Sequence, residues 1–154
     1  MSAYYLDTSA LVKRYIDEIG SVWLRANIDP VLRPFLVISQ LLVVEVHSAL
    51  NRRLREGTIS QDDYTRTKHA FQGDCQNEYN LIPVSEAIVD LACDLLERHP
   101  LRASDAIHLA TALTSNRLLS GHGLPAFTFL CADDRLIDAA TAEGLATDNP
   151  NHHL

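Results

Sequence analysis

Short runs of consecutive apolar residues alternate with longer amphipathic segments along the whole chain. The run at residues 35–38 contains no polar side chain, and the others are mostly apolar, which is typical of strands that are covered on both faces. The amphipathic segments have apolar residues at helical spacing, and several begin at a serine or aspartate that can cap a helix. Strands are expected at residues 4–6, 35–38, 80–84 and 127–131, with 145–147 as a candidate edge strand, and helices are expected to begin near residues 10, 20, 39, 60, 85, 104 and 133.

This alternation of strands and helices predicts an α/β protein, because parallel strands that follow one another need a crossover connection, usually a helix. The expected architecture is a three-layer α/β/α sandwich with a mostly parallel central sheet. A chain of 154 residues has the usual size of one domain, so residues 1–154 are expected to form a single unit. Only the polar tail, residues 148–154, is expected to be loosely held.

Composition narrows the class of protein. Apolar residues make up 47% of the chain, which excludes a disordered chain, and no apolar stretch approaches the roughly 18 residues of a membrane-spanning helix. The N-terminal residues lack the basic and apolar regions of a signal peptide. Cys75, Cys93 and Cys131 are odd in number, and none lies in a CxxC motif. We therefore expect a cytoplasmic protein with reduced thiols and no membrane segment.

The net charge of the chain is acidic: 13 Lys and Arg residues stand against 20 Asp and Glu residues, which gives −7. A protein that binds nucleic acid by general attraction to phosphate is usually basic, so this charge argues against that mode of binding. Carboxylates that converge on a cation would change this balance, since the ion neutralises part of their charge. The positions of the acids therefore matter more than their number.

Four acidic positions stand where an acid suggests a function. Asp7 follows the first expected strand, and the pair Asp133-Asp134 follows the fourth, at strand ends where α/β proteins bind ligands. Glu45 lies inside an apolar helical segment, and Asp105 lies in the first turn of another apolar helix. Each position also has a structural alternative: the aspartates can cap helices or meet a helix dipole, and Glu45 can pair with an arginine.

Taken together, these positions predict a metal site. The carboxyl ends of parallel strands lie at one edge of a sheet, so the acids are expected to gather there. Carboxylates within a few ångströms repel one another unless a cation lies between them. Because the ligands would all be oxygens, Mg²⁺ or Mn²⁺ is expected rather than zinc. Such ions orient phosphoryl oxygens and activate water, which points to phosphoester hydrolysis.

The four segments that contain these acids resemble the four acidic motifs of the PIN domain family, in order and with similar spacing. They are residues 5–15 (YLDTSALVKRY), 43–50 (VVEVHSAL), 102–112 (RASDAIHLATA) and 129–136 (FLCADDRL). The resemblance extends over residues 4–151 and is strongest to the VapC ribonuclease toxins of bacterial toxin–antitoxin pairs. It implies a PIN fold and a Mg²⁺- or Mn²⁺-dependent endoribonuclease that hydrolyses RNA phosphodiester bonds by attack of water.

Carried over residue by residue, the resemblance implies that the catalytic and metal-binding acids are Asp7, Glu45, Asp105 and Asp133. Ser9 matches a small polar residue beside the first acid and is expected to hydrogen-bond the carboxylate of Asp7, with helix capping as an equal alternative. The fourth motif has two consecutive acids, so it stays open which of them faces the metal. Alignment on the Arg-Leu that follows favours Asp133.

RNA must reach an acidic site on an acidic protein, so basic side chains are expected along the groove. The candidates for RNA binding are Lys13, Arg14 and Arg102, with further arginines at positions 52, 53 and 55, although each can equally belong to a solvated helix face. His108, three residues after Asp105, is expected in the core or beside the acids.

The resemblance also implies partners for this protein: an RNA substrate, a second copy of the chain in a homodimer, and a small antitoxin whose tail enters the active-site groove. The alternative function is a catalytically silent PIN-fold module that binds RNA or protein without turnover, its acids pairing with arginines of the partner. Metal-dependent cleavage of RNA distinguishes the two.

Overall fold

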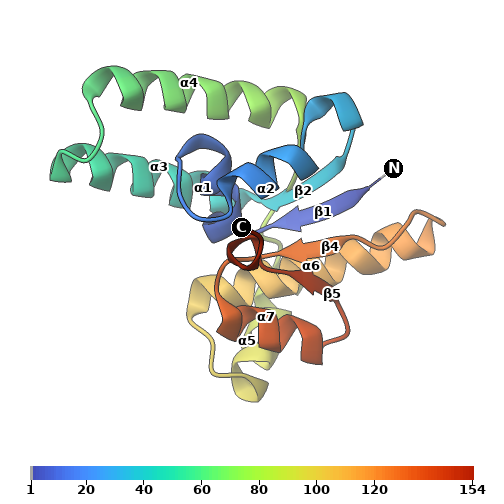
Figure 1. Ribbon diagram of the computed structural model, residues 1–154. Coiled ribbons are helices and arrows are strands. Elements are labelled where there is room, and N and C mark those ends of the chain that lie inside the picture. Colours follow the sequence, from blue (N-terminus) through green and yellow to red (C-terminus); the bar gives the residue numbers. More distant parts are fainter. Residues whose placement is uncertain (1) are drawn as a thin grey trace.

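The centre of the protein is a sheet of five parallel strands in the order β3-β2-β1-β4-β5. The computed structural model describes residues 2–154, and Figure 1 shows the sheet between two layers of helices. The strands are β1 (Ala3–Leu6), β2 (Phe35–Ser39), β3 (Tyr79–Ile82), β4 (Thr128–Leu130) and β5 (Ala146–Asp148). The candidate edge strand is therefore a strand, shifted by one residue from the prediction.

Helices cover both faces of this sheet, as the sequence pattern predicts. Helices α1 to α4 lie on one face and α5 to α7 on the other (Figure 1). Their bounds are α1 (Thr8–Tyr15), α2 (Ser21–Asn27), α3 (Gln40–Glu56), α4 (Gln61–Asn77), α5 (Glu86–Arg98), α6 (Ala103–Gly121) and α7 (Asp134–Ala142), with 3₁₀ turns η1 (Pro30–Leu32) and η2 (Pro150–His152). The three-layer α/β/α sandwich is confirmed, and none of the helices in residues 2–154 is long and apolar enough to cross a bilayer.

Two separate cores lie on the two faces of the sheet, because successive strand residues point in opposite directions. Tyr5 points toward α6, where its ring stacks on Phe129 with centroids 5.4 Å apart. The next residue, Leu6, is fully buried in the core under α1 and α3 together with Ile38. This double burial explains why the strands read as continuous apolar runs without alternation.

Serine caps begin three of the helices where the sequence predicts them. The hydroxyls of Ser39, Ser60 and Ser85 accept backbone N–H bonds at 3.1, 3.0 and 3.3 Å at the starts of α3, α4 and α5. The first helix differs from the prediction, because Asp7 is its cap and α1 begins at Thr8 rather than near residue 10. This difference places the carboxylate of Asp7 at the junction of β1 and α1.

The C-terminal tail is not loose, so that expectation for residues 148–154 is wrong. Asp148 ends β5, and Asn149, which is only 4% exposed, donates a hydrogen bond to Asp134 Oδ1 at 2.8 Å. The ring of His153 stacks on Trp23 with centroids 4.0 Å apart. These partners are distant in the sequence, so the polar composition of the tail alone could not reveal them.

Candidate functional site

The carboxyl end of β1 is the structural centre of the candidate site. β1 is the middle strand of the sheet, and its last residue is followed directly by Asp7. The loop after β4 and the start of α3 lie at the same edge, as parallel topology requires, and the first turn of α6 lies near Asp133, whose charge acts on Asp105. The segments that carry the four acidic motifs therefore meet there, although they are far apart in the sequence.

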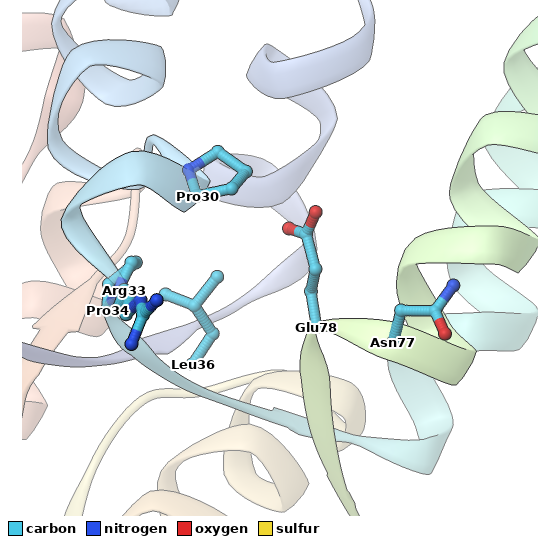
Figure 2. Close-up of a pocket in the computed structure, with 6 residues that line it drawn as sticks. All are labelled: Pro30, Arg33, Pro34, Leu36, Asn77 and Glu78. Carbon is cyan, nitrogen blue, oxygen red and sulfur yellow. The ribbon is translucent and has the colours of Figure 1, made fainter.

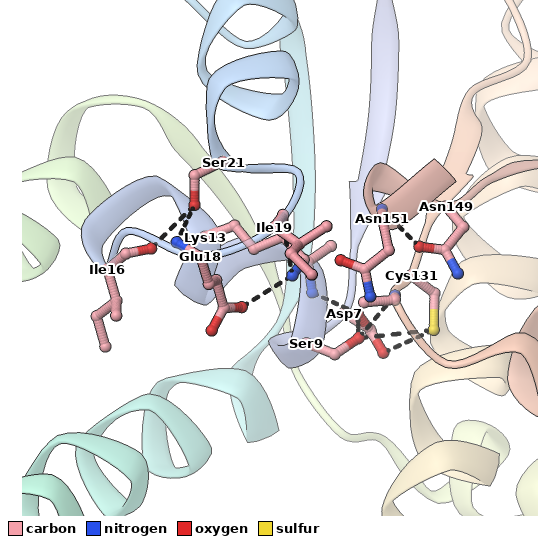
Figure 3. A network of polar contacts seen from close by, with 12 residues as sticks. Asp7, Ser9, Lys13, Ile16, Glu18, Ile19, Ser21, Cys131, Asn149 and Asn151 are labelled. Atoms are coloured by element: carbon pink, nitrogen blue, oxygen red, sulfur yellow. Dashed lines mark hydrogen bonds and ion pairs between the residues drawn. The ribbon is translucent and has the colours of Figure 1, made fainter. Parts of the chain in front are cut away.

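Asp7 is buried, and both of its carboxylate oxygens accept hydrogen bonds. Oδ1 accepts from the hydroxyl of Ser9 at 2.7 Å and from the backbone N–H of Ala10 at 3.0 Å. Oδ2 accepts from the thiol of Cys131 at 3.0 Å, and Figure 3 shows Ser9 and Cys131 beside the carboxylate. Asp7 is therefore both a helix cap and a rigidly held acid, and the hydrogen bond predicted from Ser9 is present.

Burial and the neighbouring donors have opposite effects on the pKa of Asp7. Burial raises this pKa above its ordinary value, while the positive charge of His108 and the hydrogen bonds from Cys131 and Ser9 lower it, and the net direction is upward. Burial and the charge of Asp7 raise the pKa of Cys131 far above that of an exposed thiol, so the thiol remains a neutral donor. A nearby cation would favour the ionised form of Asp7.

Glu45 is half-buried, and its partner is a histidine rather than an arginine. His108 Nε2 lies 2.6 Å from Glu45 Oε1, and the hydroxyl of Thr8 donates to the same oxygen at 2.9 Å. On the other side of the imidazole, the hydroxyl of Tyr5 lies 2.9 Å from His108 Nδ1. Burial raises the pKa of Glu45, but the hydrogen bond and charge of His108 and the bond from Thr8 outweigh it, and the pKa is lowered.

Asp105 and Asp133 form the other side of the site. Asp105 lies in the first turn of α6, and burial raises its pKa, with a further rise from the negative charge of Asp133. Asp133 caps α7 by accepting from the backbone N–H of Arg135 at 3.0 Å. The carboxylate of Asp134 instead contacts Asn149, so of the two consecutive acids Asp133 is the one whose charge acts on Asp105.

These acids share one edge of the sheet but do not form a compact cage. Within residues 2–154, no group of three His, Cys, Asp or Glu side chains stands close enough together to hold a metal ion unaided. The donor chemistry nevertheless fits a hard divalent cation, because the donors are carboxylate oxygens, and Asp7 and Asp105 both have raised pKa values. A cation at these carboxylates would offset the burial of Asp7 and Asp105 and the repulsion between Asp105 and Asp133.

Two of the three basic residues predicted to bind RNA have structural partners instead. Lys13 is only 4% exposed, and its ammonium donates to Glu18 Oε1 at 2.9 Å and to the carbonyl oxygen of Ile19 at 2.8 Å (Figure 3). The guanidinium of Arg14 lies 2.7 Å from the carboxylate of Glu78. It also lies over the ring of Tyr79, 5.6 Å from the centroid. These contacts correct the prediction for both residues, since their charge is already neutralised inside the fold.

Arg102 and Arg52 are exposed basic residues close to the acids, and the exposed Arg135 contacts Asp133 at 3.9 Å. Arg102 immediately precedes α6, and its positive charge lowers the pKa of Asp105 against the larger upward effect of burial. Arg52 lies on α3 and lines a pocket of about 380 Å³ whose wall includes Thr8, Glu45 and the exposed Val44. The sequence pattern could not separate Arg52 from its neighbours, because that choice depends on which face of α3 meets the site.

A second pocket, of about 300 Å³, lies away from the acids and is drawn in Figure 2. It is formed at the start of β2 and the end of α4, and it contains one acidic and one basic side chain. Its lining residues are Pro30, Arg33, Pro34, Leu36, Asn77 and Glu78. None of the four predicted acids is among them, so this pocket is separate from the candidate site.

Cys131 and Thr8 are site residues that the sequence analysis missed. Cys131 donates to Asp7, and Thr8 donates to Glu45. Both lie within the motif segments quoted above. Their closeness in sequence to an acid is the one feature that could have predicted a role in the site. Their hydrogen bonds join residues 124 and 37 positions apart, which no local pattern reports.

Comparison with known proteins identifies the family. The model of the PIN domain matches residues 4–140, which is most of the chain, and this protein belongs to the PIN domain family. The match includes all four acidic segments. The architecture described above is therefore that of a PIN domain.

The proteins similar to this chain include a ribonuclease and a toxin. Ribonuclease VapC46 of Mycobacterium tuberculosis is 35% identical over 151 residues, which cover 98% of this chain and 100% of that protein. The structure is also similar to a chain of VapBC2 from Rickettsia felis bound to promoter DNA, with a TM-score of 0.65 and 12% identity over 96% of this chain and 98% of that chain. For VapC20 of M. tuberculosis, a sarcin–ricin loop-cleaving toxin, the TM-score is 0.60 and the identity 17%, over 93% and 96% of the two chains.

Proposed function

We propose that this protein is a divalent-metal-dependent endoribonuclease and the toxin of a toxin–antitoxin pair. The observation that carries this proposal is the meeting of four acidic segments at the carboxyl end of β1. Membership of the PIN domain family and full-length similarity to Ribonuclease VapC46 support it. The reaction is hydrolysis of an RNA phosphodiester bond by in-line attack of water on phosphorus.

The four acids have distinct roles in this proposal. Asp7 and Asp105 would be the main residues to hold a Mg²⁺ or Mn²⁺ ion, which would supply charge for a phosphoryl oxygen and lower the pKa of a bound water. Glu45 and Asp133 would orient the attacking water or complete the binding of the ion. Ser9 and Cys131 hold the rotamer of Asp7 by their hydrogen bonds.

RNA binding requires positive charge beside these acids. Arg102, three residues before Asp105, and Arg52, in the pocket beside Glu45, are both exposed. We assign both to contacts with RNA phosphates. Phosphate contacts of this kind position the substrate without reading its bases.

The proposed partners follow from the relatives. VapBC2 of Rickettsia felis and VapBC of Salmonella typhimurium are both solved bound to DNA. By analogy, this protein associates with an antitoxin that blocks the groove beside the acids, and two copies of the chain form a dimer. Co-expression with the product of a small reading frame next to the gene, where one is found, followed by size-exclusion chromatography, tests this part of the proposal.

Substitution of Asp7 provides the central test of the nuclease assignment. Purified protein with Mg²⁺ or Mn²⁺ is expected to cleave single-stranded and stem–loop RNA, and EDTA is expected to abolish cleavage. Asp7→Asn keeps the side-chain volume but removes the ligand charge, so the rate should fall by at least about 100-fold. Cleavage is measured on gels with labelled RNA, and full activity of an extensively purified Asp7→Asn protein would refute the assignment.

The same assay distinguishes the alternative of a silent binding module. Such a module would bind RNA or protein without turnover in the presence of either ion. The Asp7→Asn variant serves as the matched control for contaminating nucleases, since it passes through the same purification.

A further inference from the structure

A row of hydrogen bonds runs from the core of the protein to the acid of the second motif. The hydroxyl of Tyr5 lies 2.9 Å from His108 Nδ1, and His108 Nε2 lies 2.6 Å from Glu45 Oε1. Tyr5 is fully buried and His108 is 2% exposed, so both nitrogens of the imidazole are shielded from bulk solvent on the protein side. The hydroxyl of Thr8 adds a second donor to Glu45 Oε1 at 2.9 Å.

The two carboxylate oxygens of Glu45 differ in their hydrogen-bond partners. Oε1 is a carboxylate acceptor and receives two donors, which means that the Nε2 atom of His108 carries a proton. Oε2 has no hydrogen-bond partner among residues 2–154. Glu45 is part of the wall of the pocket of about 380 Å³ beside Thr8, so this second oxygen remains available to a ligand.

We propose that His108 is a positioning residue that holds Glu45 by Oε1 and thereby reserves Oε2 for the metal ion or the attacking water. Tyr5 fixes the imidazole from the other side, so that the ring cannot turn away from the carboxylate. This inference rests on the proposed function, because it assigns Glu45 a role in metal-dependent hydrolysis.

A positioning role is favoured over direct chemistry by the burial of His108. A side chain that is 2% exposed cannot touch an RNA phosphate, so it acts only through Glu45. It is favoured over a purely structural role by the bond itself, because His108 places its polar edge on an acid that reaches the pocket. A histidine that served only packing would need a partner in the core, and Tyr5 already provides one.

Two substitutions of similar polarity separate positioning from packing. The amide nitrogen of His108→Gln reaches approximately the place of Nε2 and can still donate to Glu45. The shorter amide of His108→Asn reaches only the place of Nδ1 and cannot. Ser115→Ala is the matched control for damage to α6, since Ser115 is buried two turns further along the helix and donates only to the carbonyl of Thr111.

Three measurements are expected to agree. His108→Asn should weaken binding of Mn²⁺ alone to the RNA-free protein in calorimetry by roughly 10- to 100-fold, as losses of such supporting hydrogen bonds do. The same variant should lower kcat for RNA cleavage with little change in KM, and His108→Gln should recover part of both losses. In the wild-type protein without metal, the Nε2 proton of His108 should exchange slowly in NMR, and Glu45→Ala should abolish that protection.

These outcomes decide the inference separately from the nuclease assignment. If the wild type cleaves RNA but His108→Asn binds Mn²⁺ and cleaves within about twofold of Ser115→Ala, the positioning role is refuted and the nuclease stands. If the wild type shows no metal-dependent cleavage, the nuclease proposal fails, and Mn²⁺ binding with the NMR signal still tests the hold on Glu45. A loss of melting temperature equal in the Gln and Asn variants, with equal activity, also contradicts positioning.

Discussion

At the scale of single residues, Asp7 combines two functions that usually belong to different side chains. It caps α1 through Oδ1, and it is the acid at the end of the central strand. Ser9 and Cys131 donate hydrogen bonds to its two oxygens, so the carboxylate is held in one rotamer in the ligand-free protein. The cost of this arrangement is burial of a charge, which raises the pKa of Asp7.

This raised pKa makes a prediction about stability and pH in metal-free protein. Because the folded-state pKa of Asp7 lies above its unfolded value, its contribution to stability is complete at low pH and is lost as pH rises through the folded-state pKa. Asp7→Asn has no such group, so its free energy of unfolding should improve relative to the wild type as pH increases. Urea titrations in EDTA from about pH 4 to about pH 8 measure the difference in free energy of unfolding between the two proteins. The contributions of the other acids are common to both proteins and cancel in this difference.

A difference between wild type and Asp7→Asn that is constant across this range would contradict the assigned shift. Addition of Mn²⁺ to the wild type at the upper end of the range provides a control. The ion should recover stability there, since it binds only the folded protein.

At the scale of elements, α3 shows how helix periodicity selects site residues. Glu45 and Arg52 are seven residues apart, which is about two turns or roughly 10 Å along the axis, and both line the same pocket. Arg55 lies on the same helix and is exposed but does not line that pocket. Arg53 contacts Glu18 at 3.8 Å. The helix therefore presents only one of its three arginines beside the acids.

Arg52 and Arg55 form a matched pair for testing RNA binding. Arg52→Gln should weaken binding of single-stranded RNA to inactive Asp7→Asn protein and reduce the slope of log affinity against log salt by about 0.7, the loss of one phosphate contact. Arg55→Gln removes the same charge from the same helix and should leave the slope unchanged. Fluorescence anisotropy over a salt series measures both, and equal effects of the two variants would indicate only a general change of net charge.

At the scale of the whole molecule, the C-terminal segment packs against α2, which lies near the beginning of the chain. β5 pairs with β4, and η2 packs against the start of α2, where Gly20 adopts a φ of +85°. A Cβ atom at Gly20 would lie 2.5 Å from the carbonyl oxygen of Pro150. The contact of His153 with Trp23 continues this packing. Residues 148–154 are therefore part of the folded unit.

A comparison of substitutions at two glycines tests the packing of η2 against the start of α2. Gly20→Ala should destabilise the protein by at least about 2 kcal/mol, because it combines a left-handed backbone with overlap at Pro150. Gly57→Ala shares the positive φ of +74° but meets nothing within 4 Å, so its cost should be only about 1 kcal/mol. Chemical unfolding measures both values. The emission of Trp23, the single tryptophan, should change only in Gly20→Ala, and equal behaviour of the two variants would contradict the contact.

Much of this fold could be predicted from local sequence, because its elements are defined by local physics. Apolar runs covered on both faces and serine caps located β2, α3 and α4 to within one or two residues. The start of α1 was less accurate, since Asp7 competed with Thr8 and Ser9 for the cap position. The 3₁₀ turn η1 was not predicted, because its three residues carry no periodic signal.

The candidate site was predictable in part for the same reason. An acid at a strand end or inside an apolar helix face is visible in sequence, which is why Asp7 and Glu45 were found. The partners of those acids were not, since a histidine, a threonine and a cysteine have many ordinary uses. The assignment of Lys13 to RNA failed because its burial against Glu18 depends on how α1 and the following loop fold together.

The alternation of strands and helices, the starts of most elements and the acids at their ends could all be inferred from the chain alone. These features are consequences of periodicity and capping, which act over a few residues. The held oxygen of Glu45, the arginine of α3 that lines the pocket beside it and the fixed position of the tail became visible only in the folded protein. Those outcomes depend on contacts between segments distant in the chain, whose distances and burial arise only when the sheet brings them together.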